Sequence, residues 1–118
     1  MPSLYRAADA FALASLTEGF GLAIVEALGA GLPCVVHDTV NTAYLAGKFA
    51  FRGDIRAPGA MAPLIASALA GARDEDAMRA RHAWVHARFS WDVLRERYSE
   101  MLRACAAGAR PPWAGEPA

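Results

Sequence analysis

The chain has 118 residues, of which 55% are hydrophobic and 20% charged, and this composition predicts one domain, or part of one, with a modest core. Many of the hydrophobic residues are alanines, whose side chains bury little area, so the core is thinner than the percentage suggests. Twelve basic residues balance twelve acidic ones, which argues against a protein that binds nucleic acid or an anionic membrane surface.

The cysteines and the N-terminal residues indicate the compartment. Cys34 and Cys105 lie far apart without a Cys-x-x-Cys pair, and the first residues lack the basic and then apolar order of a secretory signal. Glycines, a proline and charged residues interrupt every apolar stretch before it is long enough to span a bilayer. We therefore expect reduced thiols, a cytoplasmic location and no membrane span.

A strand, a helix and a second strand are predicted in the first third of the chain. A short helix at residues 4–8 leads to a brief apolar strand at 10–14. Residues 20–30 are almost all good helix formers or bulky aliphatics, which predicts a helix buried on all sides, and Gly31 is placed to end it. Residues 33–36 are apolar throughout, as in a parallel strand with helices on both faces of its sheet.

The rest of the chain predicts an edge strand and then helices. The edge strand is expected at residues 48–51. The spacing of apolar residues over 61–69 is that of an amphipathic helix. Three carboxylates at 74–76 suit the start of the next helix, where its dipole favours negative charge. Ser90 is placed to cap a last helix.

Glu26 is the only charged residue between Gly19 and Val36. A buried carboxylate costs several kcal/mol unless something pairs with it, so an apolar helix that carries one predicts a polar ligand or a specific donor. A carboxylate that reaches solvent at a helix end, or one held by a structural arginine, would explain the same pattern.

A glycine-rich loop precedes the same helix. Glu18 is followed by Gly19-Phe20-Gly21, where two glycines allow a ligand to approach the backbone closely. Free amides at a helix N-terminus bind phosphate, and carboxylates beside them can accept hydrogen bonds from sugar hydroxyls. The alternative is that the glycines serve only a tight turn from strand to helix.

These residues belong to a longer string. It is Glu18-Gly19-Phe20-Gly21-Leu22-x-x-x-Glu26-Ala27-x-x-x-Gly31-x-Pro33-x-Val35. The string resembles the Glu-x7-Glu signature of retaining glycosyltransferases with the GT-B fold, the family-four or group 1 type, and the resemblance covers about residues 4–102. It implies an α/β fold, a partial Rossmann-like domain with a small parallel sheet and flanking helices, corresponding to the second half of a GT-B C-terminal domain.

The resemblance also implies roles for individual residues. The catalytic position beside the donor sugar falls on Glu18. Glu26 takes the position that binds the ribose hydroxyls of the nucleotide. Together with Glu26, the residues expected to bind the donor sugar and its diphosphate are Gly19, Phe20, Gly21 and Leu22.

Several features depart from the family pattern. The chain matches only the latter half of the second of the family's two domains, so we expect the acceptor-binding domain and the Arg and Lys pair that neutralises the diphosphate to lie outside these residues. Lys48, the only lysine, does not replace that pair by position. Ala14 stands where a proline is usual, and residues 37–45 diverge from the commonest sequence.

Other combinations of residues predict little chemistry. His82 and His86 are spaced for one helix face, but no third ligand is near in sequence, so we expect no metal site. Ser15 lacks the glycine-flanked context of a hydrolase nucleophile, and Cys34 lies in an apolar strand where a thiol is normally inert. Trp84 is expected in the core or against a missing domain.

We therefore interpret residues 1–107 as a partial nucleotide-sugar-binding domain and residues 108–118 as a disordered tail. The expected function is to bind a nucleoside-diphosphate sugar for retaining hexosyl transfer to an unknown acceptor, without a cofactor or metal. The isolated chain is expected to be inactive. An alternative is a non-catalytic module that keeps this fold and pairs with another chain, and an open sheet edge would favour self-association.

Overall fold

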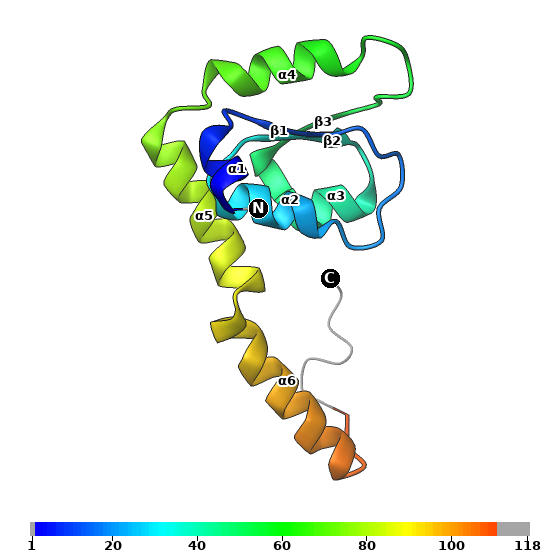
Figure 1. Ribbon diagram of the computed structural model, residues 1–118. Helices are drawn as coiled ribbons and strands as arrows, with labels where there is room; N and C mark the ends of the chain where they lie inside the picture. Colours follow the sequence, from blue (N-terminus) through cyan, green and yellow to red (C-terminus); the bar gives the residue numbers. More distant parts are fainter. Residues whose placement is uncertain (1, 111–118) are drawn as a thin grey trace. The chain divides into compact units, whose positions relative to one another are not determined.

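A computed structural model describes residues 2–110, and contacts divide the chain into two compact units, Met1–Val85 and His86–Ala118. Figure 1 labels the helices and strands along the chain. In chain order they are α1 (Pro2–Ala7), β1 (Phe11–Leu13), α2 (Leu22–Gly29), β2 (Cys34–His37), α3 (Val40–Ala46), the 3-10 turn η1 (Gly47–Phe49), β3 (Ala50–Gly53), α4 (Met61–Ala70), α5 (Glu75–Phe89) and α6 (Trp91–Ala106).

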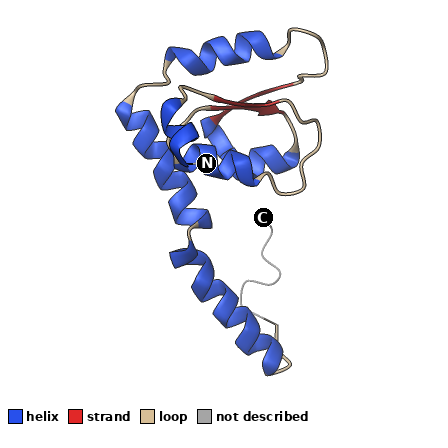
Figure 2. Ribbon diagram, viewed as in Figure 1, coloured by secondary structure: helices blue, strands red, loops and turns tan. Residues whose placement is uncertain are grey.

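The first unit is built on a parallel sheet with the strand order β1-β2-β3. Val35 in the middle of β2 pairs with Ala12 of β1 on one side and with Phe51 of β3 on the other. The helix α4 covers one face of the sheet, whereas α2 and α3 lie on the opposite face (Figures 1 and 2). The expected α/β fold with a small parallel sheet and flanking helices is confirmed.

The core of this unit lies around β2. Cys34, Val35 and Val36 are buried, as expected for a strand covered on both faces. Helices on the two faces complete the core, since Ile24, Ala27 and Leu28 come from α2, Leu45 and Ala46 from α3, and Ala68 from α4.

The prediction that α2 is buried on all sides is wrong. Its buried residues Ile24, Ala27 and Leu28 follow the spacing of one helix face, which packs toward the sheet. Leu22 is 65% exposed on another face, and Glu26, one turn later, is exposed as well. The helix is apolar in sequence because one face is core and another carries exposed aliphatic residues.

Gly31 ends α2 as the sequence predicts. It has φ +87°, in the left-handed region that favours glycine. The Gly31 amide donates to the Leu28 carbonyl, and the Leu32 amide donates to the Ala27 carbonyl. This pair of bonds is the Schellman ending of a helix, so the chain leaves α2 in a defined direction toward β2.

Two side chains of α5 form hydrogen bonds at the C-terminal ends of α2 and α3. Arg81, which is 6% exposed, donates from Nη1 to the Gly31 carbonyl at 2.9 Å. Trp84 donates from Nε1 to the Leu45 carbonyl at 3.0 Å, at the end of α3. The Leu45 carbonyl lies in the last turn of α3, where carbonyls lack donors within the helix, and Trp84 supplies one. The Gly31 carbonyl lies just past the end of α2, and Arg81 supplies its donor. Trp84 therefore packs within the unit.

In the second unit the Ser90 side chain accepts a hydrogen bond from the Val93 amide and caps α6, as predicted. The rings of Trp91 and Tyr98 meet edge to face, with centroids 6.0 Å apart. No residue of α6 is buried. Within residues 2–110, no helix combines the length and apolar character needed to cross a membrane. The predicted tail at 108–118 lies mostly outside the described residues.

Candidate functional site

The predicted site residues from Glu18 to Leu22 lie where the chain leaves the carboxyl end of β1 and enters α2, whereas Glu26 lies further along α2. In a parallel sheet the carboxyl ends of all strands meet at one edge, and ligands of open α/β sheets bind outside that edge. The segment from Ala14 to Gly21 follows β1 there, and His37 ends β2 at the same edge. The first residues of the motif thus occupy the edge at which this fold class places ligands.

The two glycines of the motif differ in what the fold requires of them. Gly21 has φ +80°, and a Cβ added to it would lie 3.0 Å from Leu45 Cδ1 and 3.1 Å from Ile24 Cδ1. The turn into α2 therefore requires a glycine at this position. Gly19 has neither a positive φ nor any atom within 4 Å of an added Cβ. Packing within residues 2–110 does not explain Gly19, whereas close approach of a ligand would.

The N-terminus of α2 has no side-chain cap. Gly21 is the N-cap residue, and the Ile24 and Val25 amides both donate to its carbonyl. The amides of Leu22 and Ala23, in the first turn, have no acceptor within the helix. Together with the positive end of the helix dipole, they form the type of site that binds an anion such as phosphate.

Glu18 is held through its backbone. Asn41, the second residue of α3, donates from Nδ2 to the Glu18 carbonyl at 3.1 Å and to the Gly19 carbonyl at 3.0 Å. The Glu18 side chain is half-buried, and its carboxylate has no hydrogen bond or ion pair to another residue of the described chain. This carboxylate is thus available to a ligand.

Glu26 interacts with α1. The Tyr5 hydroxyl donates to Glu26 Oε2 at 2.9 Å, and the Tyr5 ring meets Phe11 edge to face. Burial, the hydrogen bond and the Glu26 charge all raise the pKa of Tyr5, so its hydroxyl stays protonated and remains a donor. Of the alternatives left open for Glu26, the structure shows a carboxylate that reaches solvent and a specific donor, Tyr5. It shows no arginine that holds Glu26 among the described residues.

The structure brings α3 to Glu18 through Asn41 and α1 to Glu26 through Tyr5, two residues to which sequence patterns assign no role. Tyr5 belongs to the segment that resembles the family, but nothing in its spacing points to Glu26. Asn41 lies in the divergent segment 37–45, and an asparagine near a helix start is read as a cap. Neither signal indicates a contact across about 20 residues of chain, which only the fold reveals.

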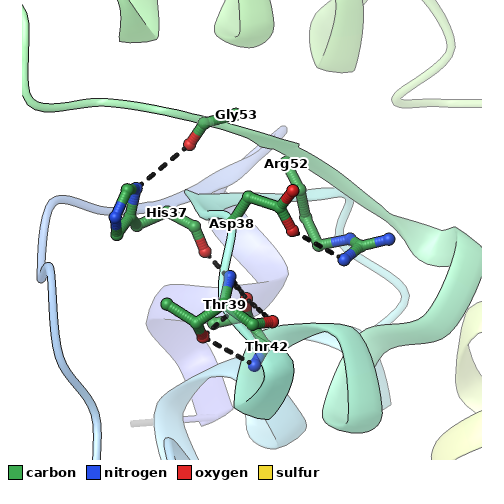
Figure 3. A network of polar contacts seen from close by, with 6 residues as sticks. All are labelled: His37, Asp38, Thr39, Thr42, Arg52 and Gly53. Carbon is green, nitrogen blue, oxygen red and sulfur yellow. Dashed lines mark hydrogen bonds and ion pairs between the residues drawn. The ribbon is translucent and has the colours of Figure 1, made fainter.

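A polar network holds the start of α3 against the end of β2, as Figure 3 shows. The Thr39 side chain accepts from the Thr42 amide, and Thr42 Oγ1 accepts from the Thr39 amide, which forms a capping box. The buried Thr42 hydroxyl also donates to the His37 carbonyl at 2.7 Å. Nearby, Arg52 pairs with Asp38 at 2.8 Å. These bonds fix the position from which Asn41 reaches the loop.

The other candidate residues have structural partners. Burial raises the pKa of Cys34 to about 12, so its thiol is protonated and unreactive at neutral pH. His82 Nδ1 lies 2.6 Å from the Gly29 carbonyl. Within residues 2–110, no three histidines, cysteines or acidic residues group in a way that could hold a metal ion.

The geometry can be compared with known protein families. The family described as glycosyl transferases group 1 matches residues 1–83, which include the whole motif and the helices around it. The chain belongs to this family. The resemblance of the Glu18 to Val35 string is confirmed.

Curated relatives are all much longer. The chain is 42% identical over 97 residues to a D-inositol 3-phosphate glycosyltransferase of Salinispora tropica, covering 78% of the chain and 20% of the relative. It is 34% identical over 110 residues to a GDP-mannose:cellobiosyl-diphosphopolyprenol alpha-mannosyltransferase of Komagataeibacter xylinus, covering 88% and 27%. It is 53% identical over 38 residues to a UDP-Gal:alpha-D-GlcNAc-diphosphoundecaprenol alpha-1,3-galactosyltransferase of Escherichia coli, covering 32% and 10%. No solved structure matches the chain.

Proposed function

We propose that this chain binds a nucleoside-diphosphate sugar as part of the donor half of a retaining hexosyltransferase. The observation that carries the proposal is the uncapped N-terminus of α2 with a carboxylate on either side of it, Glu18 before the helix and Glu26 within it. The amides suit a diphosphate and the carboxylates suit sugar hydroxyls. Membership of the family supports the same assignment.

In this proposal Glu18 lies beside the donor sugar and Glu26 binds the ribose. The amides of Leu22 and Ala23 donate hydrogen bonds to the diphosphate and stabilise the negative charge that develops on it as it leaves, which is electrostatic stabilisation of a transition state by preorganised donors. We propose that no metal ion is needed for this, and a chelator such as EDTA is expected to leave donor binding unchanged.

The chain spans 10 to 27% of the lengths of the relatives it matches. The proposal is therefore limited to donor binding. We expect sugar transfer to require an acceptor domain and basic residues, which the relatives are long enough to contain. Consumption of nucleotide sugars by the purified chain alone, tested with a panel of acceptors, is expected to be negligible. Robust turnover would contradict this expectation.

The donor base and the sugar are open in this proposal. The name of one relative specifies UDP-galactose and that of another GDP-mannose, and the chain resembles both. The binding experiment therefore uses several donors, namely UDP-glucose, UDP-galactose and GDP-mannose. Each is titrated at millimolar concentration into the labelled chain, and backbone chemical shifts are followed by NMR.

We expect one of these donors to shift the resonances of residues 18–26 selectively. The double variant Glu18→Gln, Glu26→Gln should abolish the shifts. Glu100→Gln serves as the matched control, because Glu100 is an exposed glutamate on α6, away from the motif in sequence. The proposal fails if no donor shifts these resonances, or if the double variant responds like the wild type.

An interaction module is the second candidate, and one observation favours it. Within residues 2–110, β1 pairs only with β2, so its other edge is open to a strand of another chain. Either function fits a cytoplasmic location, which we propose because Cys34 and Cys105 are both free thiols.

A further inference from the structure

Asn41 joins α3 to the loop before α2 by two hydrogen bonds from one atom. Its Nδ2 lies 3.1 Å from the Glu18 carbonyl oxygen and 3.0 Å from the Gly19 carbonyl oxygen. An amide nitrogen carries two hydrogens, so both bonds can form at once. The side chain is half-buried, which limits competition from water.

These two bonds determine where the loop amides point. Both peptide units are trans, and in a planar trans peptide the C=O and N–H groups point in opposite directions. The carbonyls of Glu18 and Gly19 point toward α3. The amides in the same two peptide units, those of Gly19 and Phe20, therefore point away from α3.

We propose that Asn41 is a positioning residue for donor binding, one that turns the Gly19 and Phe20 amides toward the donor before the donor arrives. This inference rests on the function proposed above and adds a residue outside the motif to it. Loops with two glycines lose much conformational freedom when they become ordered. By ordering the loop in advance, Asn41 reduces the entropy that donor binding must lose.

The position of Asn41 is itself fixed from a second direction. The capping box of Thr39 and Thr42 holds the first turn of α3, and the Thr42 hydroxyl ties that turn to the His37 carbonyl (Figure 3). Val40, the neighbour of Asn41, is 90% exposed. The same helical turn thus offers one residue that holds the loop and one that serves as a control.

The test compares Asn41→Asp, Asn41→Gln and Val40→Thr in the full chain. Aspartate has the size of asparagine but presents oxygen atoms to the two carbonyls and cannot donate. NMR order parameters of the Gly19 and Phe20 amides, without ligand, should fall from about 0.85 to below about 0.6 in Asn41→Asp. UDP and GDP are titrated separately. For the nucleotide that the wild type binds, the affinity of Asn41→Asp should be lower by at least about tenfold.

Asn41→Gln keeps the amide group, and so the hydrogen-bond donor, on a longer side chain. It should recover part of the lost order and part of the lost nucleotide affinity, whereas Val40→Thr should leave both at the wild-type values. Unchanged order parameters in Asn41→Asp would overturn the inference. So would a loss of order that extends equally to β2 and α4, because that result indicates a general structural role. A third outcome is that Asn41→Asp lowers the order parameters of the loop as expected but the wild type binds neither UDP nor GDP. In that case the proposed function fails, and the positioning role for donor binding fails with it.

Discussion

The Tyr5 hydroxyl donates a 2.9 Å hydrogen bond to Glu26 Oε2, joining the first helix to the second glutamate of the motif. A carboxylate accepts several hydrogen bonds, so this contact leaves Oε1 and further lone pairs available to a ligand. Tyr5 therefore orients the carboxylate without blocking it. In the proposed site, α1 therefore has the role of holding Glu26 through Tyr5.

Replacing Tyr5 by phenylalanine tests that role. Tyr5→Phe keeps the ring that packs on Phe11 but removes the hydroxyl that donates to Glu26, so the Glu26 side chain can take several rotamers. We expect nucleotide affinity to fall a few-fold, by the roughly 0.5–1.5 kcal/mol that one hydrogen bond contributes. Calorimetric titration measures the change, and an affinity that rises instead would show that Tyr5 competes with the ligand.

Glu26→Gln separates a binding role from a structural one. The glutamine keeps the shape of the side chain but weakens charge-assisted bonds to hydroxyls worth about 1.5–3 kcal/mol each, so affinity should fall about tenfold or more. Glu26 is exposed, so the melting temperature should change little. A clearly lower melting temperature with unchanged affinity would assign Glu26 to the fold instead.

The two glycines of the loop should respond in opposite ways to alanine. In Gly21→Ala the left-handed backbone costs about 1–2 kcal/mol, and the new methyl group crowds Leu45 and Ile24. A loss of 1 kcal/mol lowers the melting temperature of a small domain by about 4–8 °C. Gly19→Ala should leave the melting temperature within about 2 °C and weaken donor binding. Equal melting shifts in the two variants would refute the distinction drawn between these glycines.

Cys34 should make the protein sensitive to alkaline pH. Its pKa is raised to about 12 in the folded chain, above the value near 8.5 of an unfolded thiol. Between these values the unfolded state has lost the proton that the folded state keeps, so stability falls as pH rises from about 9 toward 12. Urea unfolding at several pH values should show this decline, and Cys34→Ala should reduce it.

The exposed Cys105 provides the control for Cys34. Cys105→Ala should leave the alkaline decline as it is in the wild type. In the native wild-type chain, a thiol reagent should label Cys105 rapidly and Cys34 only after unfolding. Rapid labelling of both thiols in the native chain would contradict the burial of Cys34.

The open edge of β1 predicts self-association. The Phe11 amide donates to the Pro33 carbonyl of the neighbouring chain segment, so by strand alternation the Ala12 amide points to the open edge. Ala12→Pro removes that donor without removing a bond to β2, and it should lower the association seen by sedimentation at increasing concentration. A wild type that stays monomeric throughout the series would contradict the prediction.

The parts of the fold that sequence patterns predicted are those set by local chemistry. The apolar run at Cys34 to Val36 indicated a buried strand, and Ser90 and Gly31 acted as helix signals just where the structure has helix ends. The all-round burial of α2 was mispredicted, because periodicity does not tell an apolar exposed residue such as Leu22 from a core residue.

The candidate site was predictable only along the motif. Glu18, Glu26 and the glycines follow one another in sequence, so their spacing carried the information. Asn41 and Tyr5 reach the motif from helices that lie about 20 residues away along the chain, and their contacts depend on how those helices pack. The full length of α3 was not predicted, because its capping box uses threonine where glutamate or glutamine is usual.

The bond from Arg81 to the Gly31 carbonyl links residues 50 positions apart, and Trp84 reaches back 39 positions to Leu45. A growing polypeptide exposes α2 and α3 long before it exposes these two side chains. During synthesis, the Gly31 and Leu45 carbonyls therefore lack these two hydrogen-bond donors until α5 emerges. The region that carries the motif is thus completed late in folding, by a helix with no residue in the motif.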